Sequence, residues 1–325
     1  MRRVGIVGAA ASLPERVVTT EELQDQVVSA SGLPLRRGVF ERATGIRRRR
    51  VARPDEQAST LAVRAARSLL RDVPDGPDVD VLIFASASRD RAEPATAHIV
   101  QAELGTSAHV FDINNACNSL LNGIDVARAL ILADRARRVL VVSGETPTRA
   151  MRWQPDSVEQ AKDSFAGYTF GDGGAALLIE EVTSGGIGRI QTDTFSEYWE
   201  VGGIAGAGSQ HPRGDEHTYF YGDGAELRDI FEKVARTIVT AFDWGHYAKV
   251  LVHQVTLPYL NQFVEAAGVP PEKLVLTLPE LGNMASATLG VQLARVFDDL
   301  PSGAKVLFVG LGGGISVMTM EWEKA

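Results

Sequence analysis

Short runs of β-branched residues alternate along the chain with longer stretches rich in alanine, leucine and arginine. The short runs predict buried strands, and the longer stretches predict helices with one apolar face. Strands are expected at residues 4–7, 79–85, 109–113, 139–143, 175–179, 250–253, 274–277, 306–309 and 316–322. Helices are expected at residues 20–29, 59–71, 95–104, 118–133, 224–243, 259–267 and 285–298. Strands spaced by helices are typical of an α/β fold with layered, buried sheets.

The same order of features occurs twice along the chain. Asp80–Phe84 resembles Lys249–His253, and each run precedes a helix, a strand, a turn of small residues and a further helix. Arg138–Gly144 then resembles Lys305–Gly310, and each half closes with a glycine-rich turn and a last strand. So many matched features in one order indicate a duplication, and we expect two similar fused halves.

The seam between the halves is expected near residue 181. It gives an N-terminal half of residues 1–180 and a C-terminal half of residues 181–325. The stretch 185–224 is more polar than its surroundings and carries Gly, Ser, His and Asp. It predicts a loop-rich insertion in the second half.

The composition is that of an ordinary globular protein, with 45% hydrophobic and 23% charged residues. There are 33 Lys and Arg residues against 41 Asp and Glu residues, a formal charge of −8, which argues against general nucleic-acid binding. No uncharged apolar run approaches the ~18 residues needed to cross a bilayer. The apolar start of the chain is interpreted as a strand rather than a signal peptide. We expect a soluble, cytoplasmic protein with neither nucleic acid nor membrane as partner.

Cys117 is the single cysteine, which excludes a disulfide framework and a zinc site built on several thiolates. It is expected at the amino end of a helix, where N–H groups and the helix dipole stabilise a thiolate nucleophile. The alternative is a small, buried, apolar thiol. The duplication places Asn283 in the equivalent position, so the two helix starts should face each other.

His253 ends a strand of buried type and could transfer a proton or donate a hydrogen bond. The alternative is a core histidine bonded to the backbone. A second group of polar residues lies in the expected insertion and could in principle bind a metal, although polar loops collect such residues in any case. Its members are His211, Asp215, Glu216 and His217.

The glycines of the segment Gly310–Gly314 have neither the dinucleotide-binding spacing nor the Gly-Lys-Ser/Thr of a phosphate loop. They allow backbone N–H groups to approach a ligand closely, or they form a sharp turn between core strands. The run Arg47–Arg50 is the one basic run. It is interpreted as a solvated strand face or as a docking site for a phosphate-bearing cofactor or an acidic carrier protein.

Together these residues resemble the thiolase-fold condensing enzymes, specifically the β-ketoacyl-acyl-carrier-protein synthase III group. The resemblance covers nearly the whole chain, and the order and separation of its short motifs carry it. These motifs are Thr44–Arg47, Ala116–Cys117, Phe170–Gly173, His253–Gln254, Gly282–Asn283 and Gly312–Gly314.

The resemblance implies a five-layered αβαβα fold of two similar fused halves, and a homodimer. It implies that Cys117 is the acylated nucleophile and that His253 and Asn283 are the other catalytic residues. The backbone N–H groups of Cys117 and Gly313 would form one oxyanion hole, and His253 with Asn283 a second one for the extender thioester. No metal or redox cofactor is implied, and the substrates would be acyl-CoA or acyl-carrier-protein thioesters. Substrate or carrier contacts are expected from Arg47, Arg48, Arg50 and Gln254.

The sequence departs from the group at several positions. Val255-Thr256 replaces the usual Ala-Asn after His-Gln, and Ser164 stands where an arginine often precedes Phe-Gly-Asp-Gly. By an ungapped count, Val39 and Ala43 stand where fatty-acid-pathway members carry the tryptophan and arginine that hold coenzyme A. These departures favour a specialised, secondary-metabolite branch with carrier-protein thioesters as possible donors.

Three functions remain for this set of residues. Decarboxylative condensation of the acyl group with a malonyl thioester is favoured, because Asn283 would serve an enolate. The alternative is transfer of the acyl group from Cys117 to a hydroxyl or amine, with His253 as general base. The third is an inactive partner subunit, which would be expected to lose its nucleophile. Residues 185–224 and 149–165 are expected to line the acyl tunnel.

Overall fold

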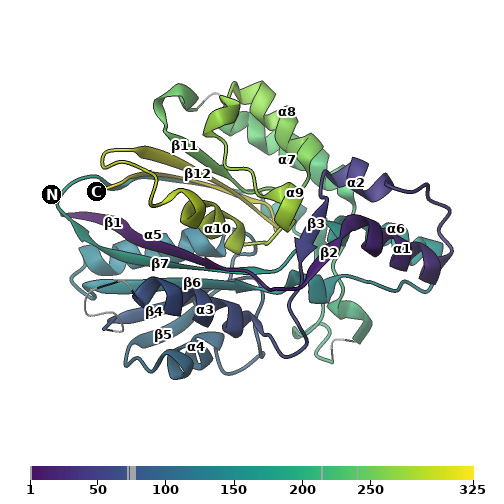
Figure 1. Cartoon of the computed structure of the whole chain (residues 1–325), viewed down its shortest axis with the longest axis horizontal. Coiled ribbons are helices and arrows are strands. Elements are labelled where there is room, and N and C mark those ends of the chain that lie inside the picture. Colours follow the sequence, from purple (N-terminus) through teal and green to yellow (C-terminus); the bar gives the residue numbers. More distant parts are fainter. Residues whose placement is uncertain (1, 72, 74–77, 214, 240) are drawn as a thin grey trace.

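The computed structural model of the protein describes residues 2–325 except residues 72, 74–77, 214 and 240. Two large β-sheets form its centre (Figure 1). The first contains, in this order, β1 (Arg3–Ser12), β7 (Gly173–Val182), β6 (Arg138–Glu145), β4 (Val81–Ala85) and β5 (His109–Ile113). The second contains, in this order, β8 (Gly186–Thr194), β13 (Ser316–Glu323), β12 (Lys305–Gly312) and β11 (Lys249–Val252).

The two sheets have the same topology. In the first, β4 runs parallel to β6, and β6 runs antiparallel to β7. In the second, β11 runs parallel to β12, and β12 runs antiparallel to β13. The edge strands β1 and β8 pair antiparallel with β7 and β13. β8 is therefore the counterpart of β1, so each half of the chain starts with the edge strand of its own sheet.

The structure differs from the sequence-based expectation at residues 186–194. These residues form strand β8, whereas the stretch from residue 185 was expected to be loop-rich. The hydrogen bonds of β8 go to β13, but most of its side chains are at least partly exposed and show little apolar alternation. The strand is therefore fixed by its backbone pairing, which the side-chain pattern does not reveal.

The strand expected at residues 274–277 is also absent. A single bridge joins Leu274 to β11, at the place where β5 pairs with β4 in the first sheet. The chain then turns directly into the short helix α9 (Leu278–Leu281). The helix expected at residues 224–243 is α7, which ends earlier, at Val239. The adjoining residue 240 lies outside the described residues.

Three layers of helices enclose and separate the sheets (Figure 1). α3 (Ala58–Arg71) and α4 (Thr96–Leu104) cover the outer face of the first sheet. α5 (Ser119–Leu132) and α10 (Ala287–Val296) lie between the sheets. α7 (Gly224–Val239) and α8 (Leu257–Ala267) cover the outer face of the second. This is the five-layered αβαβα arrangement that the resemblance implies.

The buried strands explain why apolar runs, rather than alternation, marked them in the sequence. In β6, Val139 and Val141 face the central core, whereas Leu140 and Val142 face α3 and α4. Successive side chains of a strand point to opposite faces, and here both faces are covered by helices. Each buried strand must therefore be apolar at every position.

The remaining elements gather mainly at the end of the molecule away from the two chain termini (Figure 1). The regular ones are β2 (Val17–Thr19), α1 (Thr20–Ser31), α2 (Val39–Thr44), β3 (Arg48–Arg50), α6 (Val158–Asp163), β9 (Gly202–Gly203) and β10 (Tyr221–Gly222). Short 3₁₀ turns span Pro147–Ala150, Phe165–Thr169, Ser196–Tyr198, Asp215–Thr218, Trp244–His246 and Pro271–Lys273.

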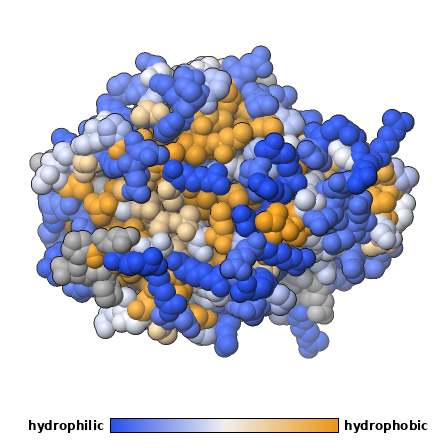
Figure 2. Space-filling model, viewed as in Figure 1, coloured by the Kyte–Doolittle hydropathy of each residue, from blue (hydrophilic) through white to orange (hydrophobic). Residues whose placement is uncertain are grey.

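Figure 2 shows that polar residues cover most of the face seen in Figure 1, with apolar residues gathered across its middle. Within the described residues, every helix is too short or too polar to span a lipid bilayer.

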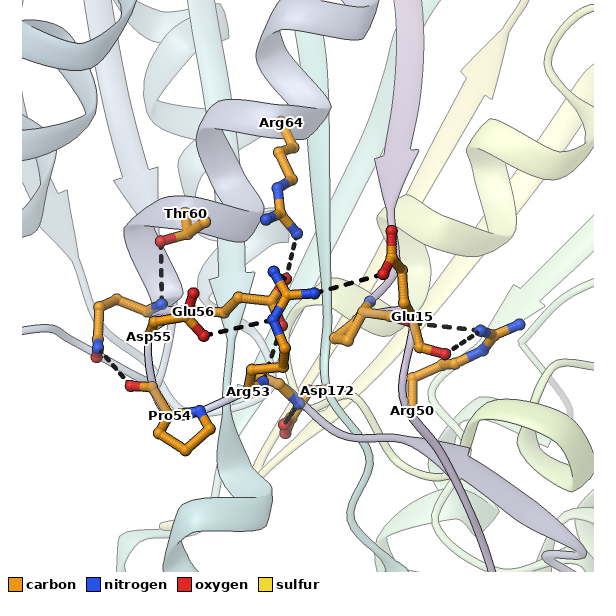
Figure 3. A network of polar contacts seen from close by, with 12 residues as sticks. Glu15, Arg50, Arg53, Pro54, Asp55, Glu56, Thr60, Arg64 and Asp172 are labelled. Carbon is orange, nitrogen blue, oxygen red and sulfur yellow. Dashed lines mark hydrogen bonds and ion pairs between the residues drawn. The ribbon is translucent and has the colours of Figure 1, made fainter.

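A network of charged residues fixes the segment that follows β3 (Figure 3). Glu56 is buried and accepts hydrogen bonds from the backbone N–H of Arg53 at 2.8 Å and from the Arg64 guanidinium at 2.5 Å. Burial alone would raise the pKa of Glu56, but these two donors outweigh it and lower the pKa below its usual value. The ionised carboxylate therefore contributes to the stability of the fold.

We expect Glu56→Gln to lower the free energy of unfolding at pH 7 by about 1–3 kcal/mol, because the donors of Arg53 and Arg64 lose a charged acceptor. A lowered folded-state pKa gives stability that is present above the unfolded value and lost as the pH falls through the folded value. The difference between wild type and variant should therefore shrink as the pH falls below the usual pKa of a glutamate. Denaturant unfolding from pH 3 to 7 tests this, and a difference that does not shrink over this range would contradict it.

Candidate active site

Cys117 lies in the tight turn between β5 and α5. Ala116, directly before it, has a φ of 46°, a left-handed conformation that a non-glycine residue adopts only when its surroundings hold it there. The Ser119 hydroxyl holds this turn, since it accepts from the N–H of Asn115 at 2.8 Å and donates to the carbonyl of Ala116 at 2.7 Å. Cys117 is thus fixed at the start of α5, and it is half-buried.

A second turn of the same shape leads into α10. Ala285 has a φ of 45°, and its N–H donates to Asn283 Oδ1 at 2.9 Å. When the positive-φ alanines of the two turns are matched, Cys117 corresponds to Ser286. The expected equivalence of Cys117 and Asn283 is therefore wrong by three residues. Asn283 lies on the approach to the turn, where its backbone pairs with that of Phe170.

The residue after Cys117 ties the first turn to the second half of the chain. Asn118 is buried, and its amide donates to the carbonyl of Ser316 at 3.1 Å and to the Ser316 hydroxyl at 2.8 Å. Its Oδ1 lies against β12 at Gly310, where a Cβ would come within 2.1 Å of it. Glycine is therefore required at position 310 so that the Cys117 turn can pack on this strand.

Gly313 follows β12 and lies beside the same turn. A Cβ on Gly313 would be 3.8 Å from the Cβ of Ala116. The backbone N–H groups of Gly313 and of Cys117 itself lie close enough to the sulfur to favour its anionic form. The two backbone donors that the resemblance assigns to an oxyanion hole therefore converge at Cys117.

His253 directly follows β11, and its N–H donates to the carbonyl of Val309 on β12 at 2.8 Å. From α10, the amide of Gln292 donates to the carbonyl of Val252 at 2.9 Å and fixes the end of the strand. His253 is 3% exposed, and its Nδ1 has no hydrogen-bond partner among the described residues. Burial lowers the pKa of His253 to about 4, so the imidazole is neutral at pH 7 and can accept a proton or donate a hydrogen bond.

Gln254 was expected to contact substrate or carrier, but its amide is bonded within the protein. Its Nε2 donates to the carbonyl of Val275 at 2.8 Å, and its Oε1 accepts from the N–H groups of Thr277 and Leu278, each at 3.0 Å. These bonds replace the missing strand ladder at residues 274–277. Gln254 thus positions the segment that leads to Asn283.

The sequence of this chain matches known synthases over both halves. The model of the family described as 3-oxoacyl-[acyl-carrier-protein] synthase III matches residues 111–197, and its C-terminal counterpart matches residues 241–324. β-Ketoacyl-[acyl-carrier-protein] synthase III of Deinococcus deserti is 30% identical over 98% of this chain and 91% of its own length. The enzyme of Methylococcus capsulatus is 29% identical over 96% of each chain. The chain belongs to the synthase III family.

Solved structures agree with this assignment. OleA of Xanthomonas campestris, in a cysteine-to-serine variant with bound lauric acid and lauroyl-CoA, is 26% identical, covers 99% of both chains and has a TM-score of 0.87. The synthase III of Xanthomonas oryzae, at 24% identity and a TM-score of 0.84 over 99% of this chain and 100% of its own, shows the same fold. This protein is therefore a thiolase-fold member of the condensing and acyl-transferring enzymes.

In this synthase III family member, the basic run at the start of the chain divides into exposed and buried parts. Arg47 and Arg48 are exposed and both pair with the carboxylate of Glu280 on α9. Arg50 is half-buried and donates to backbone carbonyls of the β1–β2 connection. Arg49 is fully buried and donates to the carbonyls of Tyr168 and Phe170. Two exposed arginines therefore remain as candidates for carrier contact.

Asp172 of the Phe-Gly-Asp-Gly motif is bonded to two other segments of the protein. It is fully buried, and its carboxylate accepts from the N–H of Ala52 at 2.7 Å and from the N–H and hydroxyl of Thr148 at 3.1 and 2.7 Å. Burial raises its pKa to about 6 against these donors. The motif therefore connects the segment after β3 to the segment after β6 by hydrogen bonds.

The Cys117 thiol is less acidic than its helix start suggested. Burial, followed by the charge of Glu145, raises its pKa to about 12, while the N–H groups of Gly313 and Cys117 act in the opposite direction. The sulfur is therefore a thiol at pH 7, contrary to the stabilised thiolate expected from the helix end alone. Reaction at Cys117 then needs a proton acceptor, and the neutral imidazole of His253 has the required charge state.

The other expected sites are less developed. In the insertion, the rings of His211 and His217 stack with their centroids 3.5 Å apart, and no described group of three or more His, Cys, Asp or Glu side chains could hold a metal.

Residues 149–165, which were expected to line the acyl tunnel, pack with Phe40 and neighbouring apolar residues in a cluster beside α1. The larger described cavity, about 430 Å³, lies at Lys305 and Trp322, at the opposite end of β12 from Gly313. It is therefore separate from the candidate active site.

We expect alkylation of Cys117 by iodoacetamide to be slow at pH 7 and to rise continuously to pH 10. The reason is that a thiol of pKa about 12 gains thiolate across this whole range without reaching a plateau. Intact-protein mass spectrometry at each pH measures the rate, with Cys117→Ala as the blank. A plateau below pH 8 would show that the site stabilises the thiolate instead.

Proposed function

We propose that the protein is a ketosynthase of type III that condenses an acyl group, carried on Cys117, with a malonyl thioester. The observation that supports this best is the convergence of the Gly313 and Cys117 N–H groups at the sulfur. These donors suit the oxyanion that forms when a thioester carbonyl is attacked at this position. The rest of the site supplies the proton transfer and the second set of donors.

In the first step the Cys117 sulfur attacks the carbonyl carbon of an acyl thioester. The S–H proton passes to the neutral His253 imidazole, a new C–S bond forms, and the oxyanion is held by the N–H groups of Cys117 and Gly313. The oxyanion then collapses, the original C–S bond breaks, and the departing thiolate takes up the proton. The products are acyl-Cys117 and the free thiol of coenzyme A or of the carrier protein.

In the second step a malonyl thioester loses carbon dioxide, and its electron pair forms an enolate. The enolate oxygen receives hydrogen bonds from His253 and Asn283. Asn283 Oδ1 already accepts from the N–H of Ala285, so its Nδ2 hydrogens are left to donate. The enolate carbon attacks the acyl carbonyl, and the Cys117 thiolate leaves and takes up one proton from the solvent. The product is a β-ketoacyl thioester, two carbons longer than the donor, and no metal or redox cofactor takes part.

The donor in this proposal is a carrier-protein thioester or a long acyl-CoA in a specialised pathway. Val39 at the start of α2 and the exposed Ala43 offer neither an aromatic ring nor a cation to hold coenzyme A in the way the resemblance implies. OleA, which binds lauroyl-CoA, has the same fold over 99% of this chain, which suggests testing a twelve-carbon donor. We further propose a homodimer formed through the outer edge of β5, an edge strand of the first sheet.

Acyl transfer to a hydroxyl or amine is the second candidate. It would use Cys117 and His253 in the same way, with His253 taking the proton of the acceptor. Asn283 favours condensation, because its free amide hydrogens serve an enolate oxygen and have no role in proton removal.

We expect Cys117 to gain the mass of the acyl group when the protein is incubated with acyl thioesters, lauroyl-CoA included, and Cys117→Ala to gain none. Adding malonyl thioester should discharge the acyl group and release carbon dioxide. Asn283→Ala should still be acylated but should condense about 10²–10³-fold more slowly, because one enolate donor is lost. A parallel reaction without malonyl thioester is the control.

Discharge of the acyl group by an alcohol or amine, with no release of carbon dioxide, would contradict condensation and support acyl transfer to a hydroxyl or amine. Acylation of Cys117→Ala to the wild-type extent would exclude Cys117 as the nucleophile.

We expect Arg47→Ala/Arg48→Ala to raise the KM for an acyl-carrier-protein donor severalfold and to leave the KM for a short pantetheine thioester unchanged. An acidic carrier loses two cations, whereas a small donor does not reach them. Glu280→Gln is the matched control. It removes the carboxylate that pairs with both arginines, so it should lower the KM for the carrier. Equal effects on both donors would show that the arginines do not contact the carrier.

A further inference from the structure

Asn118 directly follows Cys117 and occupies the N-cap position of α5, yet its side chain makes no capping bond. Asparagine is among the residues preferred at this position, because its side-chain oxygen can accept from the exposed N–H groups of the first helical turn. Here the side chain bonds to the second half of the chain instead. Its Nδ2 donates to the carbonyl of Ser316 at 3.1 Å and to the Ser316 hydroxyl at 2.8 Å. The bonds to Ser316 therefore take the place of a helix cap.

The orientation of the Asn118 amide follows from these two bonds. A carbonyl oxygen can only accept, so the amide nitrogen must lie on the side of Ser316. The Oδ1 atom then lies beside Gly310 on β12, where it is buried and has no hydrogen-bond partner among the described residues. An unpaired buried oxygen lowers stability, so an apolar side chain would fill this space at a lower cost. The cost indicates that the bonds to Ser316 do more than fill space.

Ser316 closes the hairpin that carries Gly313. It is the first residue of β13 and pairs with Gly312, the last residue of β12. In the loop between them, Gly314 and Ile315 have left-handed backbones with φ values of 73° and 50°. A β-branched residue such as isoleucine adopts this conformation only when its surroundings hold it there. The loop therefore keeps its shape through contacts with the rest of the protein, and Asn118 makes two of them at its base.

The same contacts connect the two N–H donors beside the sulfur. The Cys117 N–H belongs to the first half of the chain and the Gly313 N–H to the second, so their separation depends on how the two halves pack. The Asn118 side chain crosses between the halves at this point. Its Nδ2 is so close to the hairpin that a Cβ on Gly312 would come within 3.0 Å of it. A change at Asn118 or Ser316 would therefore move one donor relative to the other.

We propose that Asn118 is a positioning residue of the oxyanion hole, which holds the Gly313 hairpin against the Cys117 turn through its two bonds to Ser316. This inference rests on the proposed function, in which the Cys117 sulfur attacks a carbonyl group. Donors stabilise a developing oxyanion best when they are fixed in place before the reaction begins. Asn118 is fully buried, so it acts through the placement of the Gly313 N–H and not by contact with the acyl group.

Two reagents separate this role from a general effect on structure, because both react with Cys117 and only one forms an oxyanion. With para-nitrophenyl acetate, the sulfur adds to the carbonyl carbon and its proton passes to His253. The oxyanion then collapses, the C–O bond breaks, and para-nitrophenolate leaves and takes up the proton, so that acetyl-Cys117 remains. With iodoacetamide, the sulfur displaces iodide from a saturated carbon and its proton is lost to the solvent. No oxyanion forms in that reaction.

The first variant is Asn118→Leu, which approximates the size of the side chain and removes both bonds to Ser316. We expect it to slow acylation by the ester roughly 10–10²-fold, because a displaced donor loses much of its effect on the oxyanion. Alkylation by iodoacetamide should keep the wild-type rate. Intact-protein mass spectrometry measures both rates, with Cys117→Ala as the blank.

The second variant, Ser316→Ala, keeps Asn118 and its bond to the backbone carbonyl. It should slow acylation by a smaller factor, again without an effect on alkylation, and it serves as the test if Asn118→Leu does not fold. In Asn118→Leu/Ser316→Ala the two effects should not add, because both variants act through one contact.

Three results would overturn the proposal, in variants whose folding is checked by circular dichroism and thermal unfolding. The first is acylation at the wild-type rate in Asn118→Leu or in Ser316→Ala. The second is an equal loss of acylation and alkylation, since the sulfur itself would then be displaced. The third is a wild type that iodoacetamide alkylates and the ester does not acylate. Failure of every acyl thioester or of malonyl condensation would count against the proposed function only, because the ester needs neither carrier nor coenzyme A.

Discussion

Two helices packed between two sheets determine the arrangement of this protein. α5 and α10 are covered on both sides, so the two sheets fix the position of each helix. They touch where Gly290 approaches Leu120, and a Cβ there would come within 3.0 Å of Leu120 Cδ2. The turns before both helices share one backbone bend, with a φ of 46° at Ala116 and of 45° at Ala285. Cys117 directly follows the first bend, and Asn283 lies two residues before Ala285 in the second.

Much of this arrangement could be predicted from the sequence. Repeated apolar runs indicated two similar halves, because strands buried on both faces must be apolar throughout. The strand β8 was missed because its pairing with β13 leaves most of its side chains at least partly exposed. The sequence alone also could not show which residues of the two turns correspond to each other. Matching Cys117 with Asn283 was plausible from spacing, and only the backbone angles of Ala116 and Ala285 show that the match is Ser286.

The charges of the site follow from its burial more than from its helix ends. The expected acidic thiol of Cys117 assumed that a helix dipole dominates, an effect worth about 0.3–1 kcal/mol when exposed. Burial works against every charged form, and it leaves both the thiol and the His253 imidazole neutral at pH 7. In the proposed mechanism both groups therefore start neutral, and one proton transfer from the thiol to the imidazole begins the reaction.

The same burial acts on Glu145, where it raises the pKa of the carboxyl against the hydrogen bonds that Ser286, Ser88 and Ala87 donate to it. A carboxylate at the end of a buried strand is visible in the sequence as an acid directly after Val139–Gly144. Its partners are not visible there, because Ala87 and Ser286 come from distant segments. Burying an acid costs several kcal/mol unless its hydrogen bonds are satisfied, and the donors around Glu145 satisfy both oxygens. These donors come from the segment after β4 and from the turn that leads into α10, so the side chain of Glu145 joins both segments to the end of β6.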